Sequence, residues 1–261
     1  MILEADLDKK DFIKIHQETF GKTGCRRIVP GEYLAADPKG RAIMIGAVEK
    51  QKFVYLTSRD SENRMTISSP LEAHKSNTIC FDLTALDVGY ENPLFVSLEV
   101  EYGDFENENS TVNTGEYNKL LVYYEMDLGL NHVVRKNAEI VDKTAHLLIP
   151  IPGTNDGPGG VLVCYEDYIM YKGNEERITP LPRRNESNRG LMIVNYTMYK
   201  KPGMFFFLAQ SEVGDIYKIS LNYTGQNVHG LQIQYFDTIP VSVSLSLIPG
   251  FILASCESGN Q

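Results

Sequence analysis

The sequence predicts an all-β protein made of repeated four-stranded antiparallel sheets. Short apolar strands recur at intervals of roughly 45–50 residues, and turns rich in Gly, Pro and Asn separate them. No window has the apolar spacing and the cap that are typical of an amphipathic helix. This period and composition are typical of β-propeller blades. We therefore expect one partial β-propeller domain over residues 1–261, with four complete blades and two half-blades.

The repeated unit is an apolar strand, a turn beside a glutamate, and a second strand that is often aromatic. The glutamates are 50, 67, 46 and 45 residues apart, and the long interval contains the polar stretch Gly103–Asn118. We interpret this stretch as a mobile loop insert. The apolar runs Ile43–Val48 and Phe205–Leu208 are continuous, which favours inner strands that neighbouring blades cover on both faces. The marker glutamates are Glu49, Glu99, Glu166, Glu212 and Glu257.

We name the strands of a blade A to D, from the inner strand to the outer one. A tight turn, Asp37-Pro38-Lys39-Gly40, separates A from B in the first complete blade, with Pro and Gly at favoured turn positions. The same pattern fits three further blades, near residues 78–142, 145–182 and 190–237. The four strands of the first blade are expected at Glu32–Ala36, Arg41–Val48, Lys52–Thr57 and Arg64–Ser68.

Two half-blades are expected at the ends of the sequence. Ile2–Leu7 and Phe12–Phe20 fit a C and a D strand, whereas Val241–Leu247 and Phe251–Cys256 fit an A and a B strand. Unpaired sheet edges invite association with other chains. We therefore expect this chain to be part of a longer protein, and the sequence leaves open whether the half-blades close on each other.

Composition excludes several classes of function. The net charge of −9 argues against a broad, non-specific grip on nucleic acid, which requires a basic surface. No apolar stretch reaches the roughly 18 residues of a membrane span, and the start of the chain does not resemble a secretory signal. The cysteines are too far apart for a metal clip, and we expect them to be reduced core residues. They are Cys25, Cys80, Cys164 and Cys256.

No catalytic, metal or cofactor site is predicted. The sequence lacks a nucleophile elbow, a Walker loop and a metalloprotease motif. The stretch Gly157–Gly160 precedes a strand rather than a helix, and so we interpret it as a plain loop. The five histidines fall in different blades. Carboxylate pairs such as Glu166 and Asp167 lie at strand ends, where solvated side chains are the simpler interpretation.

Basic residues cluster at three places in this acidic chain. The clusters are either solvated surface or a charged interface with an acidic protein or an RNA backbone. They are Lys22 with Arg26 and Arg27, Arg183 with Arg184, and Arg135 with Lys136.

Blade topology brings the first two clusters to one rim. In a propeller, the B–C turns and the D–A connections leave from the same face of the blades. Phe20–Val29, Ser69–Asn77 and Arg183–Arg189 are expected D–A connections, and the turns at Glu49, Glu166 and Glu212 are expected B–C turns. The rim then carries charges of both signs on rigidly held loops, as protein-binding scaffolds do.

Several long segments carry a family resemblance. They are Lys14–Pro30, Ala35–Ile43, Ser68–His74, Asp87–Pro93, Asp127–Lys136, Met204–Ile219 and Tyr235–Val241. In these segments the chain resembles the splicing factor 3B subunit 3 family, the large propeller proteins of the U2 snRNP, and it resembles them from end to end. The match falls in the later part of the first, seven-bladed propeller of that family. Gly103–Asn118 and Asn185–Arg189 depart from the family pattern.

The resemblance implies a nuclear, non-catalytic protein–protein scaffold without a cofactor. It would hold the helical-repeat subunit 1 and the small subunit 5 of splicing factor 3B, beside other U2 snRNP proteins, in a complex that helps the snRNP engage the branch site in pre-mRNA splicing. RNA contact would be indirect or weak. The alternative is a propeller that contacts nucleic acid directly, as in the related DNA-damage and polyadenylation families. The expected partner-binding residues are Phe20, Lys22, Arg26, Arg27, Ser69, Glu72, His74, Lys75, Arg135 and Lys136.

Overall fold

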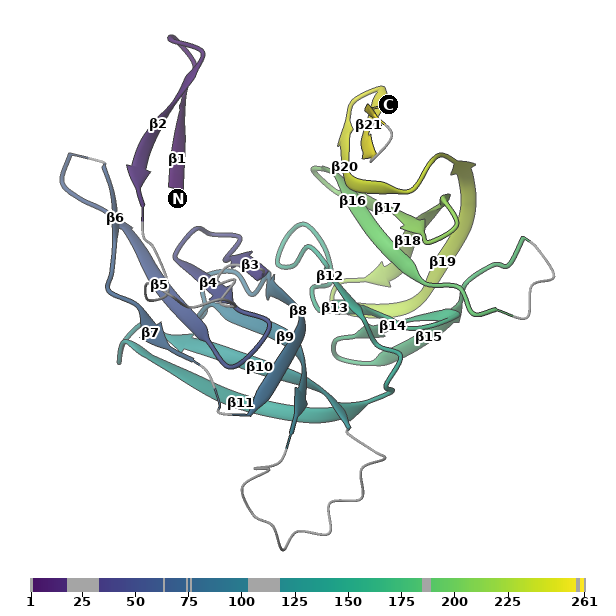
Figure 1. Ribbon diagram of the computed structural model, residues 1–261, viewed down its shortest axis with the longest axis horizontal. Coiled ribbons are helices and arrows are strands. Elements are labelled where there is room, and N and C mark those ends of the chain that lie inside the picture. The colour runs from purple at the N-terminus through teal and green to yellow at the C-terminus, as the bar shows by residue number, and fades with distance from the viewer. Residues whose placement is uncertain are drawn as a thin grey trace, which may run out of the picture.

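The computed structural model describes residues 2–17, 33–62, 64–73, 75, 77–102, 118–184, 189–256 and 259–260. Every regular element in these ranges is a β-strand, and the strands pair antiparallel. The sheets follow one another around an open ring (Figure 1). The predicted all-β propeller fold is therefore confirmed, with four four-stranded blades and two small sheets.

Each blade is a meander in which consecutive strands pair, and the predicted blade limits are close to the observed ones. Blade 1 contains β3 (Tyr33–Ala36), β4 (Ala42–Gly46), β5 (Lys52–Arg59) and β6 (Met65–Ile67). Blade 2 contains β8 (Thr78–Leu86), β9 (Leu94–Glu101), β10 (Lys119–Asp127) and β11 (His132–Val141). Blade 3 contains β12 (Leu147–Pro150), β13 (Val161–Cys164), β14 (Tyr168–Lys172) and β15 (Glu176–Pro180). Blade 4 contains β16 (Ile193–Lys201), β17 (Met204–Ser211), β18 (Asp215–Thr224) and β19 (Asn227–Thr238).

The outer edge of blade 1 differs from the prediction. A fifth strand, β7 (Leu71–Glu72), pairs with the start of β5, while β6 pairs with its end. The outer strand is split because Pro70 has no N–H to donate to the ladder. Beside this break, the backbone N–H of Leu56 donates to the hydroxyl of Ser68 instead (2.9 Å). The first residues of the predicted connection Ser69–Asn77 therefore belong to the blade edge.

Two small sheets flank the opening of the ring. β1 (Ile2–Asp6) pairs with β2 (Asp11–His16), as expected for two consecutive strands. β20 (Ser242–Ile248) pairs with β21 (Phe251–Cys256), and a short β22 (Gly259–Asn260) adds a third strand that the sequence did not predict. The described backbone pairings keep these two sheets separate, and Figure 1 places them on opposite sides of the opening.

The hydrophobic core lies between consecutive blades rather than within one sheet. Along β13, Val161 and Val163 pack toward blade 2, whereas Leu162 and Cys164 pack toward blade 4. Successive residues of a strand point to opposite faces. An inner strand with a blade on each side therefore needs an unbroken apolar run, which explains why β13 is buried throughout.

The apolar run Ile43–Val48 was expected to be covered on both faces, and this expectation is only half correct. Ala42 and Met44 of β4 are fully buried against blade 2, but Ile43 and Ile45 are half-buried. Among the described residues, no complete blade packs against their face.

Polar contacts join the inner strands of neighbouring blades. β8, β16 and β20 each contain a bulge, and the bulges in β8 and β16 directly precede Asp82 and Asn195. A bulge re-aims a side chain, and in both strands the polar side chain reaches the next blade's inner strand. Three inter-blade pairs result: Asp82 with the N–H of Leu148 (2.6 Å), His146 with the carbonyl of Ile193 (2.8 Å), and Asn195 with the carbonyl of Ser242 (3.2 Å).

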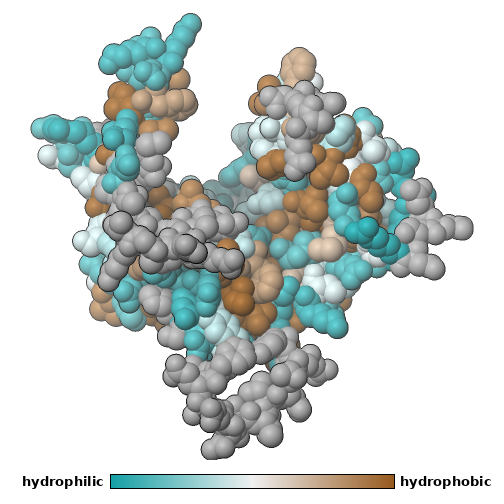
Figure 2. All heavy atoms as spheres, viewed as in Figure 1, coloured by the Kyte–Doolittle hydropathy of each residue, from teal (hydrophilic) through white to brown (hydrophobic). Residues whose placement is uncertain are grey.

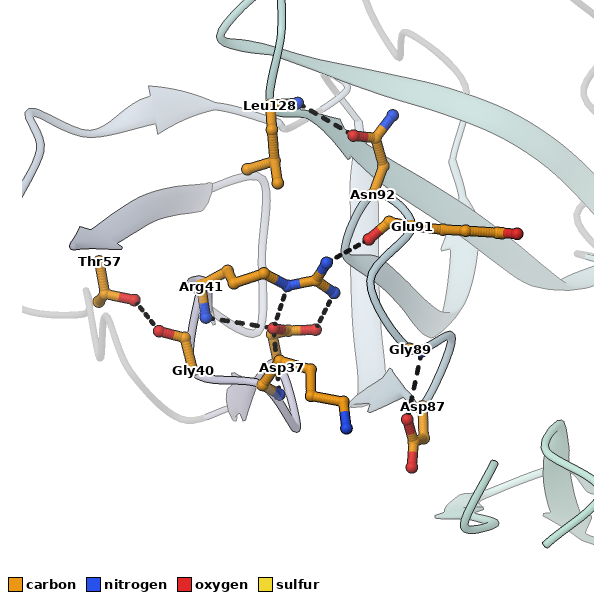
Figure 3. Close-up of polar contacts among 10 residues, drawn as sticks. Asp37, Gly40, Arg41, Thr57, Asp87, Gly89, Glu91, Asn92 and Leu128 are labelled. Atoms are coloured by element: carbon orange, nitrogen blue, oxygen red, sulfur yellow. Dashed lines mark hydrogen bonds and ion pairs between the residues drawn. The ribbon is translucent and has the colours of Figure 1, made fainter. Parts of the chain in front are cut away.

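The A–B turns make a second set of contacts between blades. The predicted tight turn is present: Gly40 has φ +68° and its N–H donates to the carbonyl of Asp37 (2.7 Å). The Asp37 carboxylate accepts two hydrogen bonds from the guanidinium of Arg41 (2.8 and 2.9 Å), and Arg41 also donates to the carbonyl of Glu91 in blade 2 (Figure 3). The turns of blades 1 and 2 are thereby fixed to each other.

The prediction for Glu99 is wrong. As a marker glutamate of the repeat, Glu99 was expected beside a turn, but β9 continues to Glu101, and Glu99 is fully buried inside the strand. Its carboxylate lies 3.2 Å from the ammonium of Lys52 in blade 1, which is also fully buried. The hydroxyls of Ser97 and Tyr124 donate to the same oxygen (2.5 and 2.9 Å). This ion pair replaces the solvated turn that the repeat suggested.

Three of the four cysteines are buried free thiols, as the sequence predicts. They are Cys80, Cys164 and Cys256. Burial raises the pKa of Cys80 to about 12 and also raises that of Cys164, so both are protonated at neutral pH. Cys25 lies outside the described residues.

Apolar side chains are exposed on both sheets beside the opening. Leu7 and Phe12 are exposed in the β1–β2 hairpin, and Val243 and Phe251 in the β20–β21 pair. Figure 2 shows hydrophobic residues along the two arms that border the opening.

The buried ion pair generates a stability prediction. Lys52→Met leaves the Glu99 carboxylate buried without its counter-charge, and we expect the free energy of unfolding to fall by about 3–5 kcal/mol. The double variant Lys52→Met/Glu99→Gln contains no buried charge and is expected to recover most of this loss. Urea unfolding followed by circular dichroism measures both effects.

The matched control is Lys200→Met, which removes the half-exposed ion pair between Lys200 and Asp156 (2.7 Å). It should cost about 1 kcal/mol or less. Equal losses for Lys52→Met and Lys200→Met would contradict the role assigned to the buried pair.

Candidate protein-interaction surface

The B–C turns and the D–A connections do lie on one side of the blades, and we call this side the B–C face. Among the described residues, it consists of the turns 47–51, 165–167 and 212–214 and of parts of the connections, which are residues 68–73, 75, 77, 142–146, 181–184, 189–192 and 239–241. Backbone hydrogen bonds join a turn to a connection at three places. They are Lys50 N–H to the carbonyl of Thr78 (3.0 Å), Asp167 N–H to that of Leu191 (2.9 Å), and Ile239 N–H to that of Gly214 (3.1 Å).

Half of the predicted partner-binding residues lie outside the described residues. They are Phe20, Lys22, Arg26, Arg27 and His74. The expected shared position of Arg26 and His74 on one face therefore stays a prediction, and so does the mobile loop at Gly103–Asn118, of which only Asn118 is described.

Lys75 and Arg135 are brought together, although 60 residues separate them in the sequence. Both bind the carboxylate of Glu101 at the end of β9, each at 2.6 Å. Lys75 comes from the connection between blades 1 and 2, and Arg135 comes from β11 on the outer edge of blade 2. We call these three residues the Glu101 cluster. It joins the loop between two blades to the outer strand of one of them.

The two cations set the protonation state of Glu101. The hydrogen bond from Lys75, the charge of Arg135 and the other contacts of these side chains lower the pKa of Glu101, although partial burial opposes them. Because this pKa lies below the ordinary value of 4.5, the ion pairs stabilise the fold above that pH. Their contribution is lost as the pH falls through the folded-state pKa.

Lys136 does not belong to this cluster, although it is adjacent to Arg135. Lys136 is the extra residue of a bulge in β11, because its neighbours Arg135 and Asn137 pair with the consecutive residues Tyr124 and Tyr123, and a bulge re-aims a side chain. Lys136 forms an ion pair with Glu125, whose other carboxylate contact is the side-chain amide of Asn92 (2.8 Å) in the A–B turn of blade 2. Glu125 pairs with the first residue of β9, whereas Glu101 is the last one. The acidic partners of Arg135 and Lys136 therefore lie at opposite ends of the blade.

Ser69 and Glu72 lie on the split outer edge of blade 1. Both are exposed. The carbonyl of Ser69 accepts a hydrogen bond from the hydroxyl of Ser68 (2.8 Å). Glu72 pairs with Phe53 through the backbone in β7, so it lies on a strand rather than on the loop that the sequence suggested.

The basic cluster near Arg183 is confirmed as part of the B–C face, and each of its arginines contacts a carboxylate. These contacts cross from blade 3 and the connection after it to the B–C turns. Arg183 lies 2.5 Å from Asp167, Arg184 lies 2.9 Å from Asp215, and Arg189 lies 3.2 Å from Glu212. The rim carries both charge signs, as predicted, and the two signs neutralise each other locally.

Asp167 organises this part of the face. It has φ +71° in the B–C turn of blade 3, a conformation that Asp tolerates better than most residues. Its backbone N–H donates to the carbonyl of Leu191, and its carboxylate accepts from the N–H of the same residue (2.9 Å each). Its carbonyl accepts from the N–H of Leu181 (2.8 Å). One residue therefore fixes both ends of the connection that carries the arginines.

The sequence reasoning missed the acidic partners of the basic residues. Glu101 was not singled out, and Glu166 rather than Asp167 was taken as the marker of its turn. Asp215 follows Gly214 at the start of an apolar strand, and this position could have indicated that its carboxylate lies at the turn. The partners were missed because each pair joins segments that are distant along the chain.

Among the described residues, no three His, Cys, Asp or Glu side chains come together as a metal site requires. The ring nitrogens of His146 lie within hydrogen-bond distance of two backbone carbonyls, Nδ1 of that of Thr144 (2.9 Å) and Nε2 of that of Ile193 (2.8 Å). These contacts give His146 a structural role. No helix within the described ranges could span a membrane.

Comparison with known proteins agrees with the fold. The whole chain, residues 1–261, matches the family model described as the RSE1/DDB1/CPSF1 first beta-propeller. The chain is 49% identical to spliceosome-associated protein 130 A of Arabidopsis thaliana and 50% identical to splicing factor 3B subunit 3 of Danio rerio. It is 45% identical to pre-mRNA-splicing factor prp12 of Schizosaccharomyces pombe. All of the chain is covered in each comparison, but only 22–23% of each relative, so the chain spans less than a quarter of their length.

The Glu101 cluster can be tested by titration. In Lys75→Ala, we expect the pKa of Glu101 to rise toward its ordinary value, and to rise more than in Arg135→Ala, because the hydrogen bond from Lys75 has the largest effect. Carbon-13 NMR of the glutamate carboxyl groups over a pH series measures this directly. Lys136→Ala is the matched control, which should raise the pKa of Glu125 and leave that of Glu101 unchanged. A rise in the pKa of Glu101 that is larger in Lys136→Ala than in Lys75→Ala would refute the assignment of Lys75 and Arg135 to the Glu101 cluster.

Proposed function

The chain belongs to the RSE1/DDB1/CPSF1 first β-propeller family, and from this premise we propose that it is a non-catalytic protein–protein scaffold of the splicing factor 3B complex. The proposed setting is the U2 snRNP in the nucleus, where the complex acts in pre-mRNA splicing and branch-site engagement. The relatives named as splicing factors support this setting, since they match the chain along its whole length at 45–50% identity.

The observation that carries the scaffold proposal is the construction of the B–C face. Its charged side chains project from loops that inter-blade hydrogen bonds and ion pairs fix in place. A surface held in this way binds without paying much ordering entropy, which favours affinity. A mixed-sign rim also favours specificity, because a wrong partner meets like charges.

The proposed partners are the helical-repeat subunit 1 and the small subunit 5, with other U2 snRNP proteins further away. The expected contacts comprise the Glu101 cluster, Ser69 and Glu72, together with the predicted residues outside the described ranges. Lys136 is kept as a separate, weaker candidate, since its partner Glu125 lies at the other end of blade 2.

Direct nucleic-acid contact is the second candidate, because the matching family description also includes DDB1 and CPSF1. The charges of the B–C face weigh against it. An RNA or DNA backbone requires a surplus of cations, whereas Arg183, Arg184 and Arg189 each face a carboxylate. RNA contact is therefore proposed to be indirect or weak.

Charge reversal tests the scaffold proposal. Lys75→Glu should lower the amount of helical-repeat subunit that co-purifies with the chain by roughly three- to tenfold, because it places like charges at the interface. Arg26→Glu/Arg27→Glu should do the same if the sequence-based assignment is correct. The control Lys201→Glu, an exposed change next to the A–B turn of blade 4, should have no effect.

A swap variant, Lys75→Glu/Glu101→Lys, keeps an ion pair at this position but exchanges the positions of the two charges that a partner would contact. Binding that stays weak in the swap supports an interface. Unchanged co-purification in Lys75→Glu and in the arginine variant would reject this face as the docking surface.

Salt dependence separates the two candidate functions. We expect a uridine-rich 20-nucleotide RNA to bind the chain with at most millimolar affinity at 50 mM salt, because the surface offers few unneutralised cations. Fluorescence anisotropy over a salt series checks this. Micromolar binding that weakens steeply with salt would favour the nucleic-acid alternative.

A further inference from the structure

A small pocket opens on the B–C face between blades 3 and 4. Its volume is about 80 Å³, which is enough for one small side-chain group rather than for a cofactor. Val213, which is 61% exposed, provides an apolar side chain beside it. The polar part of the wall consists of Arg183, Arg184, Arg189, Glu212, Asp215 and Tyr217.

Arg184 is held in a fixed orientation at this pocket. Its Nη1 donates to the carboxylate of Asp215 (2.9 Å) and to the hydroxyl of Thr238 (2.8 Å), and its guanidinium stacks on the ring of Tyr235 at 3.9 Å. Thr238 in turn donates to Asp215 (2.5 Å). The side chain of Arg184 is nevertheless 45% exposed. Both hydrogen bonds use a single nitrogen of a group that has five N–H donors, so further donors remain on a side chain that lines the pocket.

Tyr217 supplies a second, independent signal. Its side chain is completely buried and forms part of the pocket wall, yet its hydroxyl has no hydrogen-bond partner among the described residues. A buried polar group without a partner is costly and demands an explanation. Burial and the neighbouring Asp215 raise the pKa of Tyr217, so the hydroxyl remains a proton donor at neutral pH.

The charges of the pocket define what can bind. Arg184 and Tyr217 can both donate hydrogen bonds, and a ligand group that accepts satisfies both of them. The three arginines outnumber Glu212 and Asp215 in the wall by one positive charge, and with Asp167, which contacts Arg183, the group is neutral. This balance disfavours phosphates and RNA, which carry more negative charge per group. A single carboxylate matches the fork of an arginine and the size of the pocket.

We propose that this pocket binds an aspartate or glutamate side chain of a peptide segment in a protein partner, with an adjacent apolar residue of that segment against Val213. The carboxylate accepts hydrogen bonds from Arg184 and from the hydroxyl of Tyr217. This inference rests on the proposed scaffold function for the nature of the occupant, but it concerns a different part of the B–C face from the Glu101 cluster.

The probes are two capped peptides, acetyl-Gly-Glu-Leu-Gly-amide and its Gln counterpart, each titrated into the 261-residue chain. NMR follows the Arg184 side-chain N–H and the Tyr217 ring. We expect saturable shifts with the Glu peptide and roughly tenfold weaker binding of the Gln peptide, because charge-assisted hydrogen bonds are lost. Inorganic phosphate and oligouridylate serve as competitors, and neither should displace the peptide.

Two variants separate binding from folding. Tyr217→Phe removes only the hydroxyl, and should weaken the Glu peptide roughly three- to tenfold while thermal stability stays equal or increases, because no protein hydrogen bond is lost. Arg184→Gln should weaken the Glu peptide roughly tenfold or more. Arg184→Lys should bind with intermediate affinity, since it keeps the charge but not the fork. The control Arg177→Gln removes an arginine in β15 that contacts Glu175, and should leave binding unchanged.

Three outcomes would overturn the proposal. The first is the absence of a saturable shift with the Glu peptide in the wild-type chain. The second is equal binding of the Glu and Gln peptides. The third is a destabilised Tyr217→Phe that binds the Glu peptide normally, which would assign the hydroxyl a structural role. A separate measurement tests the scaffold function: it would fail if the helical-repeat subunit did not co-purify with the wild-type chain.

Discussion

The packing of each blade against the next positions the other parts of this structure. The three large buried clusters lie between blades 1 and 2, 2 and 3, and 3 and 4, whereas a small fourth cluster is formed by residues of the β20–β21 sheet. Apolar burial favours this packing but does not fix its register, because the hydrophobic effect has no direction. Directional contacts, such as Asp82 with Leu148 and Arg41 with Glu91, supply the register between the sheets.

The same inter-blade geometry produces the candidate surface. Lys75 and Arg135 meet at Glu101 only because the connection after blade 1 passes beside β11 of blade 2. Below this cluster, the hydroxyl of Tyr124 reaches Glu99, which pairs with Lys52 of blade 1. Polar residues thus join the buried interface between two blades to the charged rim above it. A surface supported in this way resists deformation, which suits a platform for protein partners.

Sequence patterns were reliable where the physical signal is local. The turn at Asp37–Gly40 depends on a few neighbouring residues, and this prediction agrees with the structure. The errors arose where a distant segment decides. Glu99 looked like a turn marker because its spacing matched the repeat, but a lysine from another blade stabilises it inside a strand. The split edge at Pro70 was overlooked, although a proline inside a strand is a local signal for such a break.

The fold class, the number of blades and the family could be predicted from the sequence, because period, strand composition and turn residues are properties of short segments. The shared face of the B–C turns and D–A connections was also predictable, since alternating strand directions require it. Which charges meet depends on the packing of the blades. This packing united Lys75 with Arg135, separated Lys136 from them, and placed Arg184 over Tyr235 in the wall of the pocket that Tyr217 also lines. Ion pairs and pockets depend on distances between segments of different blades, and those distances exist only after the blades have packed.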